Sequence, residues 1–156
     1  HIVPFTTYRD DGPYGPGSLQ QYIEYDIEHH YFNFTPDERE TLRPVVLFDI
    51  LANNADRKGS HIFFEEGTQT LYGIDHGICF HEENKLRTVI WDFSGQQIPD
   101  DLLAPLADAE NWSGLFEQYL NPHEIRAIQR RARTLLKSRT FPLRPADRRA
   151  FPYPPI

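Results

Sequence analysis

Two polar turn segments, residues 53–61 and 73–80, flank a stretch whose pattern is typical of a β-hairpin. The residues between them form two runs rich in β-branched and aromatic side chains, and residues 66–67 supply the turn. A hairpin returns the chain to the point where its first strand begins. Asp56 and Asp75 are therefore predicted to lie close together in space, although they are far apart in the sequence.

The composition indicates a folded domain and argues against several other classes of protein. The chain has 156 residues, of which 39% are hydrophobic and 13% aromatic, so a folded domain with a core is expected rather than disorder. Its formal net charge of −7 is opposite to the basic surface of nucleic-acid-binding proteins, so no nucleic-acid partner is expected. The single cysteine, Cys79, excludes an internal disulfide. No apolar run approaches the roughly 20 residues that span a bilayer, and we expect a cytoplasmic protein without an integral membrane segment.

A helix is predicted over residues 35–52. Thr35 and Glu38 have the residue types and the spacing of a capping box, which marks the first turn of a helix. Pro44 lies inside this segment and lacks the amide hydrogen that a helix interior needs, so the helix should bend or restart there.

The second half of this helix is apolar on nearly all sides, which predicts that it is buried. Asp49 is the one charged residue within the apolar run. A buried carboxylate without hydrogen-bond partners is costly, so Asp49 is expected to bind nearby polar backbone groups or Arg57.

The rest of the chain is predicted to contain a strand, three further helices and an extended tail. Residues 18–25 are typical of a strand. Capping and apolar patterns in the C-terminal half indicate helices at residues 99–107, 111–120 and 121–137. The proline-rich tail, residues 142–156, should be extended, with hydrophobic anchors at Phe151, Tyr153 and Ile156.

The order of helix, loop, hairpin and Asp-x-Gly turn resembles the C-terminal lobe of the protein-kinase-like superfamily. The closer likeness is to its atypical branches: the phosphatidylinositol 3-/4-kinase-like proteins, the HipA-type toxin kinases and the secretory-pathway kinases. Those proteins carry an Asn-x-Asp-Arg loop, which is residues 54–57 here, and a later Asp-x-Gly motif, which is residues 75–77 here. Most of the chain is similar to a bacterial family of uncharacterised phosphatidylinositol-kinase-like proteins.

This resemblance implies an α+β fold, namely a mostly helical kinase-like C-lobe with a hinge strand and a catalytic β-hairpin. Residues 1–30 would be the end of the N-terminal lobe and the hinge, residues 31–141 the C-lobe, and residues 142–156 the tail. Because the sequence begins with His1 and not with Met, we expect a fragment of a longer chain. The missing N-terminal lobe would carry the phosphate-binding lysine and the glycine-rich cover of related kinases.

The activity implied by the resemblance is transfer of a phosphoryl group from ATP to a hydroxyl acceptor, with Mg²⁺ as the metal. The acceptor could be an inositol lipid, another small alcohol, or a protein Ser or Thr. Asp56 matches the catalytic aspartate that deprotonates the acceptor, and Asn54 and Arg57 belong to the same catalytic loop. Arg57 has a second interpretation, as a structural partner of Asp49.

The resemblance also implies a metal site. Asp75 matches the aspartate that holds Mg²⁺ against the nucleotide phosphates. His61 stands where relatives carry a second metal ligand, usually Asn and sometimes Glu. Imidazole is a poorer ligand for Mg²⁺ than a hard oxygen, so His61 could instead suit Mn²⁺, donate to a phosphate oxygen, or do neither.

For the nucleotide, the resemblance implies a hinge within the N-terminal strand, where backbone groups meet adenine. The expected ATP-binding residues are Gln20, Tyr22 and Ile23 of this segment, together with Ile74, which precedes the metal-binding aspartate.

Two rival interpretations remain open from the sequence. One is a pseudokinase-like module that keeps the scaffold without catalysis, which the unusual His61 and the missing lobe favour. The other is a metal-dependent hydrolase built from several histidines and the two aspartates. The candidate metal ligands of this hydrolase are His29, His30, His61, His76, His81, Asp56 and Asp75.

Overall fold

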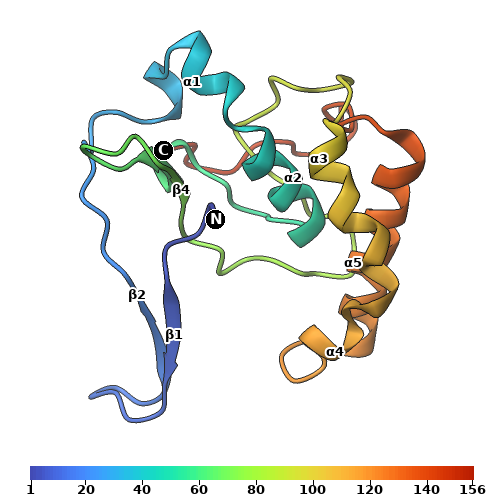
Figure 1. The fold of residues 1–156 in the computed structure, drawn as a ribbon, viewed down its shortest axis with the longest axis horizontal. Coiled ribbons are helices and arrows are strands. Elements are labelled where there is room, and N and C mark those ends of the chain that lie inside the picture. Colours follow the sequence, from blue (N-terminus) through green and yellow to red (C-terminus); the bar gives the residue numbers. More distant parts are fainter.

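The chain combines short helices with two small antiparallel hairpins, an α+β arrangement, in a computed structural model that describes residues 1–156 (Figure 1). The strands are β1 (Thr6–Arg9), β2 (Gly17–Gln20), β3 (Ile62–Phe64) and β4 (Leu71–Gly73). The α-helices are α1 (Pro36–Glu40), α2 (Arg43–Ala52), α3 (Asp100–Leu103), α4 (Ser113–Phe116) and α5 (Pro122–Ser138). Three 3-10 helices complete the fold: η1 (Tyr31–Asn33), η2 (Gly59–His61) and η3 (Ala104–Trp112).

The first hairpin, β1–β2, extends away from the rest of the molecule (Figure 1). Its register pairs Thr6 with Gln20 and Arg9 with Gly17, and nearly all of its residues are exposed. The strand predicted over residues 18–25 is therefore too long, because β2 ends at Gln20. Its only partner, β1, begins at Thr6, which pairs with Gln20. Beyond this pair, one further hydrogen bond joins the Gln21 amide to the Phe5 carbonyl.

The helix predicted over residues 35–52 is divided into α1 and α2. Thr35 and Glu38 form the predicted capping box at the start of α1, with the Thr35 amide 2.8 Å from Glu38 Oε2. Pro44 lies in the first turn of α2, where a missing amide hydrogen costs nothing, so the proline restarts the helix.

The hydrophobic core lies around α2. Leu42 and Val45 are fully buried there, together with Ile90, Phe93 and Phe141 from later in the chain. Helix α5 packs against α2 and η3 and contributes its own buried apolar face. Neither α5, the longest helix, nor any other helix has the length and apolar character needed to cross a bilayer.

The second hairpin, β3–β4, has the predicted position, but its loop is longer than the predicted turn at residues 66–67, because the Glu65 amide still bonds to the Thr70 carbonyl. It pairs Ile62 with Gly73 and Phe64 with Leu71. Tyr25 stacks on Phe63 with ring centres 4.0 Å apart, so the segment that follows the first hairpin runs beside the second one. The hairpin returns residue 75 to the start of β3, as the sequence predicted, because the Ile74 amide donates to the His61 carbonyl at 2.9 Å.

The C-terminal tail is irregular and lies along the body of the molecule (Figure 1). The Ala150 carbonyl accepts hydrogen bonds from the Thr88 amide at 3.1 Å and from Trp91 Nε1 at 3.3 Å. Further on, the Pro155 carbonyl accepts from the Gly59 amide at 2.8 Å. The tail is thus fastened by its backbone to two segments, one of which is the loop that precedes β3.

The predicted tail anchors Phe151, Tyr153 and Ile156 are wrong, since all three side chains are exposed. Phe151 and Tyr153 instead lie beneath the guanidinium groups of Arg144 and Arg149, both from the tail itself. The tail is held by its backbone carbonyls and by the buried Ala150 and Pro152, which lie on either side of Phe151.

Candidate functional site

The loop that follows α2 begins with a reversal of the chain at Asn53. This residue caps the helix in a left-handed conformation, with φ of 56°. Asn53 Nδ2 donates to the carbonyls of His81 and Glu83, and Asn53 Oδ1 accepts from the Lys85 amide at 3.0 Å. The sequence interpretation missed this role, although an asparagine directly after an apolar helix is a recognisable signal for a C-terminal cap.

Asn54 shapes the next turn of the loop. Its amide nitrogen Nδ2 donates to Asp49 Oδ1 at 3.0 Å, and its Oδ1 accepts from the Asp56 amide at 2.9 Å. The Asn54 carbonyl also accepts from the Arg87 amide. Because the side chain is buried, these contacts fix the backbone that carries Asp56.

Arg57 binds three parts of the site with one guanidinium. Nε lies 3.1 and 3.0 Å from the two Asp49 oxygens, and Nη2 lies 2.9 Å from Oδ1. Nη1 donates to the carbonyls of His61 at 3.3 Å and Ile74 at 2.7 Å. Helix α2, the start of β3 and the end of β4 are therefore joined at a single side chain that has no solvent exposure.

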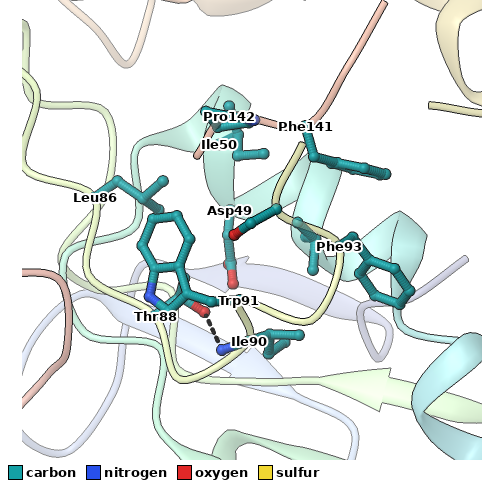
Figure 2. Close-up of a pocket in the computed structure, with 11 residues that line it drawn as sticks. Asp49, Ile50, Leu86, Thr88, Ile90, Trp91, Phe93, Phe141 and Pro142 are labelled. Atoms are coloured by element: carbon teal, nitrogen blue, oxygen red, sulfur yellow. Dashed lines mark hydrogen bonds between the residues drawn. The ribbon is translucent and has the colours of Figure 1, made fainter. Parts of the chain in front are cut away.

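Asp49 is also one of the residues that line a small cavity of about 10 Å³ in the core (Figure 2). Thr88 and Trp91 line this cavity with apolar residues, and Thr88 Oγ1 accepts from the Ile90 amide at 3.1 Å. The predicted pairing of Asp49 with Arg57 is confirmed. Asp49 is thus paired with Arg57 and lies among packed side chains.

These positions revise two of the expected catalytic roles. Asn54 and Arg57 are at most 1% exposed, so neither can touch a substrate. Both are positioning residues that hold the loop. Asp56 differs from them, because its side chain is 29% exposed and its Oδ2 lies 3.7 Å from Lys58 Nζ. Asp56 is the one acid of this loop whose carboxylate can reach solvent or a ligand.

Asp75 and His61 lie side by side at the open end of the second hairpin. Asp75 Oδ2 is 3.4 Å from His61 Nε2, and the Asp75 side chain is 59% exposed. Burial lowers the pKa of the His61 imidazole below its ordinary value, although the carboxylates of Asp75 and Asp56 act in the opposite direction. The imidazole is therefore neutral near pH 7, with both acids in its neighbourhood.

This pair fits a metal ion in part. Adjacent ligands of an octahedral ion, with bonds of about 2.1 Å, lie roughly 3 Å apart, which is close to the separation of Asp75 and His61. No group of three or more His, Cys, Asp or Glu side chains in the structure could hold a metal.

The expected nucleotide-binding residues differ in their exposure to solvent. Gln20 and Tyr22 are exposed, whereas Ile23 is buried and its side chain belongs to the core. The backbone groups of the exposed Tyr22 form no hydrogen bond within the chain, so they are free to pair with a ligand, whereas Ile23 is too deeply buried to reach one. The backbone of Ile74 is already bound, because its amide donates to His61 and its carbonyl accepts from Arg57.

Among the remaining histidines, His76 lies near His61 and Asp75, and burial lowers its pKa to about 4. His29 contacts Glu38, and His81 Nδ1 accepts from the Glu83 amide in the following turn. His76 turns inward and packs its ring edge-on against Phe48, with ring centres 4.7 Å apart. The histidine cluster required by the hydrolase interpretation is therefore not assembled.

Comparison with known proteins finds a relative that is longer than this chain. The chain is 43% identical over 144 residues to "Protein Rv2133c" of Mycobacterium tuberculosis. The matched region covers 89% of this chain and 51% of that protein, so the chain spans about half the length of the curated relative it matches. No protein-family model matches the chain.

The buried pair predicts a strong effect on stability. Asp49→Ala leaves the Arg57 guanidinium buried without its carboxylate, and we expect the free energy of unfolding to fall by about 3–5 kcal/mol. Urea denaturation followed by circular dichroism measures this change. The matched control is Glu110→Ala, which breaks the exposed pair with Arg133 and should cost less than about 1 kcal/mol. Equal losses in the two variants would contradict the role given to Asp49.

The half-buried thiol of Cys79 gives a prediction of pH-dependent reactivity. Burial, with a further contribution from the Asp49 carboxylate, raises the pKa of Cys79 from 9.0 to about 12. The fraction of thiolate at pH 8 is then about a thousandfold lower than in the unfolded chain, so alkylation by iodoacetamide should be much slower. The rate should also rise about tenfold per pH unit between pH 7 and 9. A rate that levels off below pH 9 would contradict this environment.

Proposed function

We propose that the chain is the C-terminal lobe of a kinase that transfers a phosphoryl group from ATP to a hydroxyl acceptor. The observation that carries this proposal is the pairing of Asp75 with His61 beside the loop that bears Asp56. Two carboxylates from distant parts of the sequence lie near one imidazole, and the buried Arg57 fixes both ends of the hairpin between them. Phosphoryl transfer depends largely on such positioning.

Asp56 is the proposed general base. Its partly exposed carboxylate can accept the proton of the acceptor hydroxyl, and assistance of this kind contributes about 10²–10⁴ in rate. The bond from the Asp56 amide to Asn54 Oδ1 fixes the backbone that carries the carboxylate. Lys58, whose Nζ lies 3.7 Å from Asp56, supplies a positive charge where the attacking oxygen and the phosphate would meet.

Asp75 is the proposed metal ligand. Asp75 would hold Mg²⁺, which when bound would neutralise the charge of the nucleotide phosphates. The exposed carboxylate of Asp75 is a hard oxygen ligand of the kind that Mg²⁺ prefers. His61 is held neutral by burial and is suited either to Mn²⁺ or to donating a hydrogen bond to a phosphate oxygen.

The proposed hinge lies in the segment that leaves the first hairpin. The free backbone groups of the exposed Tyr22 suit the edge of an adenine ring. An isolated two-stranded hairpin is only marginally stable in water, and Phe5, Tyr8 and Tyr14 on this one are largely exposed. These features, and the greater length of the matched relative, support a second lobe that covers the hairpin and completes the nucleotide site.

A second candidate function is a non-catalytic module with the same scaffold. The observation that favours it is His61, a histidine in the position where kinases carry an oxygen ligand. The acceptor of an active enzyme would be an inositol lipid, a small alcohol or a protein hydroxyl, since a fold does not fix its substrate.

The test uses the protein in its complete encoded form, including any residues outside 1–156. Mg²⁺-ATP at 100 times its Kd should stabilise the wild type by about 2.7 kcal/mol in a thermal-shift measurement. Asp75→Asn should abolish this shift while keeping the unliganded melting temperature. Glu117→Gln, an exposed carboxylate away from the site, is the control and should keep the full shift.

Asp56→Asn separates binding from catalysis. This variant should keep the Mg²⁺-dependent shift and lose about 10²–10⁴ in ATP turnover, because only proton transfer is affected. A wild-type protein that binds Mg²⁺-ATP without any turnover would favour the non-catalytic module. An unchanged shift in Asp75→Asn would exclude the metal-binding role of that residue.

A further inference from the structure

A groove of about 840 Å³ lies between α5, the tail and the segment of residues 82–86. This volume is within the range of small-molecule sites. None of the proposed catalytic or metal-binding residues lines it. The groove therefore requires an explanation separate from phosphoryl transfer.

Three arginines line the groove: Arg130 and Arg131 from α5, and Arg148 from the tail. None of them lies within 4.0 Å of a carboxylate, whereas five other arginines of the chain are paired with an acid. Their recorded partners are backbone carbonyls and one amide oxygen. The guanidinium groups are thus held in place while their charge is left without a counterion.

Arg131 is the clearest example of a guanidinium group that is held in place without a counterion. Its Nε donates to the Leu51 carbonyl at 2.8 Å and its Nη1 to the His81 carbonyl at 3.4 Å. Its Nη2 is buried without any hydrogen-bond partner. Burial and the neighbouring charge of Arg130 lower the pKa of Arg131 to about 10, which still leaves the group charged at neutral pH. A bound anion would relieve this repulsion between like charges.

The two acidic residues of the lining offset the charge of the three arginines only in part. Glu82 is directed to His123, with 3.6 Å between Oε2 and Nδ1, and Asp147 is exposed. The groove therefore keeps an excess of positive charge in a protein whose net charge is −7.

The floor of the groove is apolar. The groove shares Ile50, Leu86, Trp91, Phe141 and Pro142 with the small core cavity, and all five are seen together in Figure 2. The indole ring and the adjacent aliphatic side chains offer a surface for a ring or an alkyl chain. Fixed positive groups beside such a floor match a ligand with one charged end and one apolar end.

We propose that this groove binds an amphiphilic anion, that is, a phosphate or carboxylate group attached to an apolar body. The arginines contact the oxyanion through charge-assisted hydrogen bonds, and the apolar body covers the indole of Trp91. The proposal does not depend on the kinase activity, since no residue of the phosphoryl-transfer site is used.

Calorimetric titration of the complete encoded protein with decyl phosphate, below its micelle threshold, tests the proposal. We expect one site per chain and similar binding of decanoate, with at least tenfold weaker binding of decanol and of inorganic phosphate. Arg130→Gln and Arg148→Gln should each weaken decyl phosphate binding about tenfold. Asp147→Asn removes a competing negative charge and should strengthen it.

Lys137→Gln is the matched control, because Lys137 lies on α5, carries the same charge and does not line the groove. It should leave the affinity unchanged. Leu143→Glu, at an exposed position of the lining, should abolish binding without affecting the core. Equal affinity for decanol and decyl phosphate, equal weakening by Lys137→Gln and Arg130→Gln, or no binding to the wild type would each overturn the proposal.

Discussion

The buried pair of Asp49 and Arg57 is the interaction on which the rest of the site depends. Taking two charges out of water costs several kcal/mol, and the pair is tolerated only because further hydrogen bonds satisfy both groups. The Asn54 side chain donates a further hydrogen bond to the Asp49 carboxylate, and the carbonyls of His61 and Ile74 accept further hydrogen bonds from the Arg57 guanidinium. The same bonds that offset desolvation therefore also fix where the helix, the loop and the hairpin meet.

A second constraint comes from segments that have no regular structure of their own. Residues 87–89 run parallel to the loop, where the Arg57 amide donates to the Arg87 carbonyl and the Val89 amide to the Arg57 carbonyl. The tail in turn covers Thr88 and reaches Gly59 with its backbone. Buried backbone groups must be paired, and here irregular segments pair with one another in place of a larger sheet. The proposed site is thus built mainly from loops held around one helix.

Local chemistry explains why much of this could be predicted from the sequence. The capping box at Thr35, the restart at Pro44 and the position of the second hairpin follow from residue types at short spacing. The approach of Asp75 to His61 also follows, because a hairpin must return to its origin. The length of β2 and the fastening of the tail were not predictable, because each depends on which distant backbone groups remain unpaired.

By itself, the sequence determined the order of helix, loop, hairpin and turn, and it identified Asp75 and His61 as residues that this order brings together. Only the tertiary structure decided which residues of the loop face outward. Asn54 and Arg57 are buried while Asp56 remains accessible, since burial depends on the carboxylate that α2 supplies beneath the loop. The groove beside α5 was likewise invisible in the sequence, because its arginines and its apolar floor come from segments that meet only after folding.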